Sequence, residues 1–444
     1  MFELFFYYLD KLDNIVWSYL SIPTILLLGF YLSHQSQWTQ IFKFGRVIRV
    51  FFSFFSYNQP HARGTHPLKV FFAGISGSIG ISNVIGVCTA VQLGGPGAVF
   101  WLWVASLVGM IVKYAEIYLG IKYRVTNQEG GYDGGPMYYL QKATSVRFIP
   151  HIACILLCIY GADVYIFRTV TDALVNNWGF NHCLSVILLL LCILIGIEKG
   201  VERVGNIASM IIPIFLIGFI GASFYIFIKN AHVLPDTLWL IITSAFTGHA
   251  AVGAFTGAGV ISTMAYGLKR ACYAGDIGIG YASVIHSETE EQDCARQASL
   301  GIVSIFLDAF IVSTISMLLV LVTGVWNQGL PESVAVSTAL STAIPYMYYL
   351  WPLFIFLLGY STLLTILTAG KKAAKFLSPV RGEWWYTMFA VLNFSLFSFF
   401  GTNQQMLGIM SLVGGLLLII NLYGMVILVP QISFALHENT DAQK

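Results

Sequence analysis

Apolar segments about 20 residues long recur along nearly the whole chain and are separated by short polar stretches. Such segments are long enough to cross a bilayer as helices. The pattern predicts a leading span at 17–32 and ten further spans at 68–97, 99–119, 149–175, 183–197, 206–228, 238–268, 298–325, 350–368, 384–400 and 406–429. This pattern leaves no room for a separate soluble domain. It predicts an all-α polytopic membrane protein with 11 transmembrane helices.

The second apolar segment, Leu68 to Gly97, contains residues that do not suit a continuous helix in lipid. It carries no charge after Lys69, but it is interrupted by small and polar residues: Gly74, Ser76, Gly77, Ser78, Gly80, Ser82, Asn83 and Gly86. An unpaired backbone group is costly in hydrocarbon, so a broken helix persists only where it faces protein or a water-filled cavity. Freed carbonyls and hydroxyls there can hold a cation. The alternative is a glycine-rich helix packed closely against its neighbours.

A second interruption is expected in the span 238–268, whose middle reads GHAAVGAFTGAG and breaks at Gly253 to Gly257. Without the leading helix, ten spans divide into two sets of five, and each set opens with an interrupted helix. The two interrupted helices enter the membrane from opposite sides, which indicates an inverted repeat with a binding site between them. The expected units are residues 1–67 (leading helix and basic loop), 68–228 (first repeat), 237–429 (second repeat) and 430–444 (tail).

Charge then sets the orientation, because short cytoplasmic loops carry an excess of Lys and Arg. Only 10% of the residues are charged, against 57% hydrophobic, so the few cations are informative by position. An outside N-terminus and a cytoplasmic C-terminus place nearly all loop cations on one side, with Lys11 and Lys229 as exceptions. Lys113 and Glu116 then mark the cytoplasmic end of the span 99–119, and Lys269 and Arg270 that of 238–268. A long polar cytoplasmic loop follows, up to Gln297.

The sequence lacks the usual signatures of several other classes of protein. The chain has no phosphate-binding GxxxxGK[ST] motif, no metal-ligand cluster and no nucleophile beside a base. Its seven cysteines have no paired zinc spacing and are expected to be reduced thiols. The first helix has no basic region before it and no cleavage site after it, so we interpret it as a retained helix. An uncoupled channel, a membrane-embedded enzyme and a degenerate carrier acting as a sensor are the alternatives to a transporter.

Several motifs resemble the alanine or glycine:cation symporter family, also called amino acid carrier proteins or sodium:alanine symporters. They are GISNVIGVCTAVQLGGPGAVFWLWVASLVGMIVKYAEIYLGIKYR (80–124), GGPMYYL (134–140), FTGHAAVGAFTGAGV (246–260), GLKRACYAGDIGIG (267–280) and FLDAFIVST (306–314). The resemblance implies a leucine-transporter-type fold with one helix prepended. It also implies uptake of a small neutral amino acid across the bacterial inner membrane, driven by sodium or, less often, protons, without another cofactor or an obligate protein partner.

The resemblance also implies site residues. Substrate would meet the unwound backbone at Gly80, Ile81, Ser82 and Asn83 and at Val252, Gly253, Ala254, Phe255 and Thr256, with Phe255 as a lid or wall. One sodium ion would bind the Asn83 amide oxygen and the Ser78 carbonyl. A second would bind carbonyls near Ser76 and Ile79 and the hydroxyls of Ser361 and Thr362. The alternative for these two hydroxyls is a hydrogen bond to their own helix.

The chain also departs from the family pattern. GISN replaces GTGN at Gly80 to Asn83, and AGDIGIG replaces SNEAGLG at Ala274 to Gly280. Asp163 and Arg168 lie near the middle of the third core span, where ionisable groups are costly. They either contact a more polar substrate or replace a coupling ion, or they form a structural charge pair or extend toward the outer membrane interface. His249 could couple protons or be hydrogen-bonded filler, and Asp308 is expected in a polar network.

Overall fold

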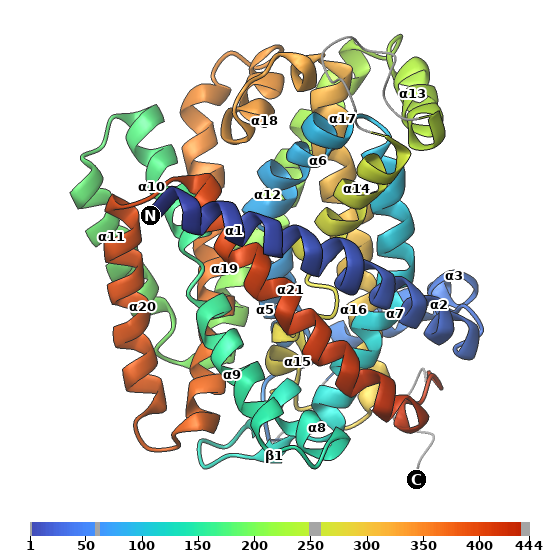
Figure 1. Cartoon of the computed structure of the whole chain (residues 1–444), viewed down its shortest axis with the longest axis vertical. Helices are drawn as coiled ribbons and strands as arrows, with labels where there is room; N and C mark the ends of the chain where they lie inside the picture. The colour runs from blue at the N-terminus through green and yellow to red at the C-terminus, as the bar shows by residue number, and fades with distance from the viewer. Residues whose placement is uncertain (1, 58–62, 248–258, 437–444) are drawn as a thin grey trace.

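The computed structural model describes residues 2–57, 63–247 and 259–436. These residues form a bundle of helices with one small hairpin (Figure 1). We call the end of the bundle with the hairpin β1 (Val125–Thr126) and β2 (Tyr132–Asp133) the hairpin end. The opposite end carries α18 (Glu332–Ser341) and is called the α18 end.

The leading segment lies across one side of the bundle. It consists of α1 (Phe2–Ile15), the π-helical turn η1 (Val16–Ser21) and α2 (Ile22–Gln35). In Figure 1 α1 crosses the front beside α21 (Asn403–Leu428), and the two helices are in contact. The Trp17 indole N–H donates to the Ser411 carbonyl over 3.1 Å. Two short helices, α3 (Thr39–Phe42) and α4 (Phe44–Ser53), and the 3-10 turn η2 (Phe54–Ser56) follow.

The first interrupted helix is present where the sequence predicts it. Helix α5 (Pro67–Ser78) begins at a proline, which has no N–H to lose. It ends at Ile79, whose ψ of 87° is not helical. The chain resumes in the π-helical turn η3 (Ser82–Gly86) and α6 (Val87–Gly94), bent by 45° from α5. The prediction of a broken helix in Leu68 to Gly97 is therefore confirmed.

Six helices continue the first half. They are α7 (Ala98–Lys122), α8 (Pro136–Ala143), α9 (Phe148–Gly161), α10 (Val164–Trp178), α11 (His182–Gly196) and α12 (Gly200–Lys229). The third core span, expected to be continuous over 149–175, is broken between α9 and α10. Asp163 is the N-cap of α10, and its carboxylate accepts from the Ile166 N–H over 3.1 Å. A capping carboxylate satisfies an N–H that a helix start leaves unpaired.

The second interruption predicted at Gly253 to Gly257 lies outside the described residues, and the structure shows a break further along the chain. After α13 (Leu234–Thr247), α14 (Val260–Ala274) and α15 (Tyr281–His286) run alongside α7, separated by Gly275 to Gly280. A Cβ added to Gly267 would meet Ala98, one added to Gly109 would meet Ile277, and one added to Gly120 would meet Ser283. The break between α14 and α15 thus lies level with the middle of α7.

Two predictions for this region are wrong as a result. Residues 271–287 do not form a polar loop, because they are buried inside the bundle. Lys269 and Arg270 do not end a span at the hairpin end, because they lie on α14 above the break, and Lys269 pairs there with Asp13 of α1. The predicted substrate residues Val252, Gly253, Ala254, Phe255 and Thr256, and His249, lie outside the described residues.

The second half continues through α16 (Cys294–Ile305), the π-helical segment η4 (Phe306–Ser313), α17 (Thr314–Val322) and the 3-10 turn η5 (Val325–Asn327). It ends with α19 (Met347–Leu377), α20 (Gly382–Phe399), α21 and the 3-10 turn η6 (Val429–Gln431). Among the described residues, seven helices are long and apolar enough to cross a membrane, or eight with the bent pair of α5 and α6. A count of eleven would also require α11, α20 and the α14–α15 pair, so it stays a prediction.

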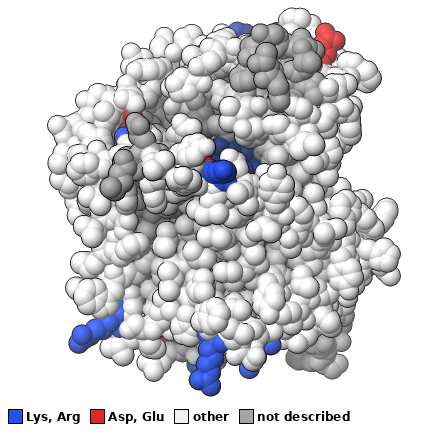
Figure 2. Space-filling model, viewed as in Figure 1, with Lys and Arg blue, Asp and Glu red and all other residues white. Residues whose placement is uncertain are grey.

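The outer surface suits a bilayer. Large apolar side chains on α12 are strongly exposed, as shown by Ile217 at 76% and Ile228 at 74%. On the face in Figure 2 most atoms are uncharged, and Lys and Arg gather mainly along the hairpin end, apart from a patch near the middle. This distribution is typical of a multi-pass membrane protein.

Close packing of α14 on α7 depends on Gly267. A Cβ at this position would lie 2.4 Å from the Ala98 carbonyl oxygen, which is backbone and cannot rotate away. We expect Gly267→Ala to destabilise the protein by about 1–3 kcal/mol through overpacking. Thermal unfolding of the detergent-purified protein measures this loss. Gly221→Ala is the control, because a Cβ there meets no atom within 4 Å. Equal melting temperatures for the two variants would contradict the α7–α14 contact.

Candidate substrate and cation site

The two interrupted helices and α19 meet at the end of α5. A Cβ at Gly77 would lie 2.4 Å from the Tyr281 hydroxyl oxygen of α15, and one at Gly80 would lie 2.6 Å from the Thr362 Oγ1 of α19. Only glycine allows such approaches. Ile79, Ile81 and Asn83 are fully buried, with 0% of each exposed. The break is therefore enclosed within the bundle.

Hydroxyl groups of α19 bind directly to the backbone of α5. Thr362 Oγ1 donates to the Ser76 carbonyl over 2.8 Å, and Thr365 Oγ1 lies 3.0 Å from the Ala73 carbonyl and 2.7 Å from Ser76 Oγ. The structure thus brings the predicted residues Ser76 and Thr362 together. Both hydroxyls also contact their own helix as in the alternative interpretation, since Ser361 Oγ and Thr362 Oγ1 each lie 2.9 Å from the Leu358 carbonyl oxygen. Thr365 was missed, although it lies one helical turn beyond Ser361 and Thr362.

On its other side the break faces η4. The Asn83 side-chain amide donates to Ser313 Oγ over 3.3 Å, while its oxygen, Oδ1, has no hydrogen-bond partner within the described residues although it is fully buried. The hydroxyl of Ser313 lies near the carboxyl group of Asp308. Neither carboxylate oxygen of Asp308 has a hydrogen-bond partner in the part of the chain that the structure describes. Asp308 is therefore buried near Ser313, and the polar network predicted for it stays a prediction.

A buried ammonium group links the two breaks, and it was not predicted. Lys113 of α7 donates from Nζ to the Gly275 carbonyl over 2.8 Å and to Ser78 Oγ over 3.3 Å. Its Nζ lies 4.0 Å from a carboxylate oxygen of Asp276. The side chains of Lys113 and Asp276 are each 1% exposed. The charge pattern predicts that Lys113 marks the end of a span. This prediction is wrong, because Lys113 is buried inside the bundle.

Glu116, one helical turn after Lys113, belongs to the same cluster. Its Oε1 accepts from the Ser283 N–H over 3.1 Å, and Asp276 Oδ2 accepts from the Ala282 N–H over 3.3 Å, so both carboxylates bind the start of α15. Asp276 has a φ of +49°, a left-handed conformation uncommon for a residue with a side chain. The spacing of Lys113 and Glu116 on one helix face was the signal in the sequence that could have revealed this cluster.

The charges of the third core span have structural partners. Arg168 donates to the carbonyls of Phe397 and Gly401 near the ends of α20 and α21. Its Nε lies 3.6 Å from Asp172, whose carboxylate also accepts from Asn403 over 3.0 Å. The carboxylate of Asp163 is used in capping α10. Both residues thus have structural partners, but Arg168 pairs with Asp172 and not with Asp163 among the described contacts.

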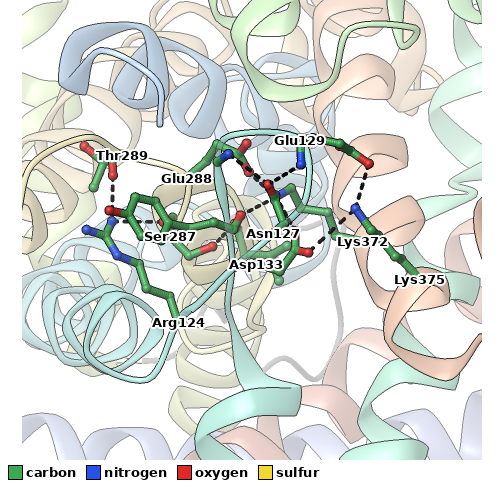
Figure 3. Close-up of polar contacts among 12 residues, drawn as sticks. Arg124, Asn127, Glu129, Asp133, Ser287, Glu288, Thr289, Lys372 and Lys375 are labelled. Atoms are coloured by element: carbon green, nitrogen blue, oxygen red, sulfur yellow. Dashed lines mark hydrogen bonds and ion pairs between the residues drawn. The ribbon is translucent and has the colours of Figure 1, made fainter. Parts of the chain in front are cut away.

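A polar network ties three segments together at the hairpin end (Figure 3). Lys372 of α19 donates to the Tyr132 carbonyl over 2.7 Å and to Asp133 over 2.9 Å, and it also pairs with Glu288. Lys375 pairs with Glu129 over 2.8 Å. A cavity of about 410 Å³ lies beside these side chains. The network thus joins α19 to the hairpin and to the segment that follows α15.

The electrostatics of the hairpin favour a charged Asp133. Its burial alone would raise the pKa of Asp133, but the ammonium groups of Lys372 and Lys375 and the hydrogen bonds it accepts lower the pKa below its ordinary value. The carboxylate is therefore ionised at neutral pH, which keeps the ion pairs of the network intact.

With this geometry in place, comparisons identify the family. The model of the sodium:alanine symporter family matches residues 3–444. The chain belongs to this family. Its relatives include the sodium/alanine symporter AgcS of Methanococcus maripaludis, 27% identical over 94% of each chain. Another is a probable sodium/glutamine symporter, GlnT of Bacillus subtilis, 24% identical over 97% of this chain and 90% of the relative.

Solved structures of transporters show the same fold as this member of the sodium:alanine symporter family. MhsT in complex with L-phenylalanine has a TM-score of 0.58 at 14% identity, covering 81% of this chain and 89% of that one. A sodium-coupled sialic acid symporter has a TM-score of 0.52 at 14% identity, covering 91% and 80%. The predicted all-α, leucine-transporter-type fold is confirmed. The family and the named relatives are transporters, so the protein is a transporter and not an enzyme.

The contacts of Arg168 generate a prediction. Arg168→Gln should lower thermal stability, because two backbone carbonyls and Asp172 lose a charged donor. It should leave the range of transported solutes unchanged, because the guanidinium group binds α20 and α21 and not the break in α5. Competition by unlabelled amino acids during uptake measures that range. An altered range in the folded variant would show that Arg168 contacts substrate.

Proposed function

We propose that the protein couples uptake of a small neutral amino acid, of the alanine or glycine class, to sodium by alternating access. Membership of the sodium:alanine symporter family supports a secondary amino acid transporter. AgcS is named a sodium/alanine symporter and GlnT a probable sodium/glutamine symporter. The two names agree on sodium and differ in the amino acid, so a small amino acid is the more specific part of the proposal. The observation that carries the proposal is the direct meeting of two interrupted helices inside an apolar bundle.

The substrate is proposed to bind at Gly80 to Asn83, opposite Gly275 to Gly280. The positive end of the helical segment that begins at Ser82 favours a carboxylate, while carbonyl oxygens and the free Asn83 Oδ1 favour an ammonium group. The wall on the α19 side is tight, since a Cβ at Gly359 would lie 3.0 Å from Ile81 and 2.2 Å from Val170. Such a site suits a small side chain. The roles proposed for Val252 to Thr256, including Phe255 as a wall, and for His249 stay open predictions.

The sodium ion is proposed to bind between α5 and α19. Ser76 and Ile79 would supply backbone carbonyls, and Thr362 and Ser361 would supply hydroxyl oxygens. The donor set fits the ion, because hard cations prefer oxygen ligands and because Ser76 and Thr362 are already in contact. The second predicted position, at the Ser78 carbonyl and the Asn83 amide oxygen, has a positive charge beside it, because the Lys113 ammonium group donates to the Ser78 hydroxyl. No other cofactor is proposed.

The orientation proposed is that of the charge pattern. The hairpin end, with Arg124, Lys372 and Lys375, would face the cytoplasm of a bacterial inner membrane, together with the C-terminal tail. The N-terminus would then lie outside. In this orientation the network around Lys372 closes the cytoplasmic side, and opening it would release substrate inward.

The second candidate is a proton-coupled carrier for a more polar amino acid. It is favoured by the buried carboxylate oxygens of Asp276 and Asp308 that have no hydrogen-bond partner among the described residues. A relative in Bacillus subtilis is described as a putative sodium/proton-dependent alanine carrier, 28% identical over 72% of this chain and 65% of the relative. An uncoupled, channel-like facilitator would need neither gradient.

Reconstitution into liposomes tests the proposal. Labelled alanine, glycine, glutamine and larger amino acids are added with an imposed sodium gradient, an imposed proton gradient or neither. We expect accumulation of alanine or glycine above the outside concentration only with the sodium gradient. Accumulation with the proton gradient alone would favour the second candidate, and equilibration without any gradient would favour a facilitator.

The α5–α19 contact also yields a mutational prediction. Thr362→Ala removes a proposed sodium ligand that also bridges the helices, so the sodium concentration for half-maximal uptake should rise by about tenfold or more, equivalent to roughly 1.4 kcal/mol. Thr362→Ser keeps the hydroxyl and should stay near wild type. Unchanged sodium dependence in the Thr362→Ala variant would contradict a sodium ion at this contact.

A further inference from the structure

We propose that the ammonium group of Lys113 is a built-in cation at the junction of the two interrupted helices and excludes a sodium ion from the position at Ser78 and Asn83. The inference rests on the proposed sodium coupling and refines it. It removes one of the two sodium positions that the family resemblance implies, and leaves the position between α5 and α19.

The ammonium group touches both breaks. Ser78 is the last residue of α5, and Gly275 directly follows α14, so the two acceptors of Lys113 belong to the ends of two different half-helices. The Asp276 carboxylate lies on its other side at 4.0 Å. A hydroxyl, a carbonyl and a carboxylate are the oxygen groups that would otherwise surround a sodium ion. Here an ammonium group donates to the hydroxyl and the carbonyl, and it stands beside Ser78, the residue whose carbonyl is a predicted sodium ligand.

The bundle leaves space for the lysine stem to reach this position. A Cβ at Gly301 of α16 would lie 2.8 Å from Ile117 Cδ1 and 3.4 Å from Lys113 Cγ, so glycine lets α16 pack closely on α7 beside the stem. A Cβ at Gly109 would lie 2.4 Å from Ile277 Cδ1, so glycine on α7 also admits the break between α14 and α15. Lys113 is thus packed from both sides, with 1% of its side chain exposed.

The surrounding charge explains why a permanent cation is needed there. Glu116, Asp276 and Asp308 are buried carboxyl groups at 0%, 1% and 1% exposure, and the ammonium group of Lys113 lies 4.0 Å from the carboxylate of Asp276. Buried carboxylates without a nearby cation are strongly unfavourable. A sodium ion at Ser78 would stand beside the ammonium group, and two adjacent cations repel each other strongly in a buried site.

The consequence concerns how many ions bind. A sodium ion leaves the protein during each transport cycle, whereas the Lys113 ammonium group is covalently attached and stays. The junction of the two helices therefore holds a cationic side chain that does not depend on an ion gradient. The protein should bind one sodium ion fewer than a carrier with both positions open.

Equilibrium binding of radioactive sodium to the purified protein tests this inference, with alanine present at saturating concentration. The variant is Lys113→Gln, which removes the charge and keeps most of the stem. The control is Lys269→Gln, because Lys269 is another part-buried lysine with an acidic partner, Asp13, away from the junction. We expect one ion per wild-type molecule, one per Lys269→Gln molecule and two per Lys113→Gln molecule.

The outcomes separate the inference from the proposed function. Two ions on the wild type would overturn the role of Lys113, and so would an unchanged number on folded Lys113→Gln. No ion on the wild type, with one on Lys113→Gln, would refute sodium coupling and still support Lys113. If Lys113→Gln does not fold, Lys113→Gln/Asp276→Asn removes both charges of the pair. This double variant should again bind one ion more than Asp276→Asn, and an equal number would overturn the inference.

Discussion

A helix can be interrupted inside a bilayer only if other groups bind the backbone that it leaves unpaired, and the whole arrangement of this protein depends on that constraint. At the first break, Thr362 and Thr365 of α19 donate to carbonyls of α5. At the second break, Lys113 binds the carbonyl of Gly275, and Glu116 accepts from the first turn of α15. Helices α7 and α19 thus act as supports on opposite sides of the two broken helices.

Glycine makes these supports possible by allowing backbones to approach. Gly80 admits Thr362, Gly77 admits Tyr281, and Gly267 brings α14 against the backbone of α7. Small residues at helix contacts are a general feature of membrane proteins, which lack a hydrophobic driving force between helices. In this protein the small residues lie beside the polar contacts. Close helix packing and hydrogen bonding of the unpaired backbone groups therefore occur at the same places. A transporter built in this way can rearrange by exchanging a few hydrogen bonds at each break.

Much of the fold could be predicted from the sequence, because periodic apolar segments and a glycine-interrupted first helix are local signals. The break at Gly275 to Gly280 could not be predicted, since the hydrogen-bond partners of its polar groups are distant in sequence. In the sequence Lys269 resembles the end of a span, because its partner, Asp13 of the leading helix, is distant along the chain. The stretch Gly275 to Gly280 resembles a loop until α7 buries it. Lys113 was assigned to an aqueous boundary for the same reason: its partners, Ser78 and Gly275, are distant in sequence. Asp163 and Arg168 were recognised as unusual, but their capping and carbonyl contacts appear only in three dimensions.

A cryo-electron microscopy structure of the protein in lipid nanodiscs, with sodium and alanine added, tests the central claim most directly. The account predicts density for the amino acid between two unwound segments, Ile79 to Ile81 and Gly275 to Gly280. It also predicts the Lys113 side chain bridging the two segments. A continuous helix through residues 270–286, with alanine bound elsewhere, would contradict it.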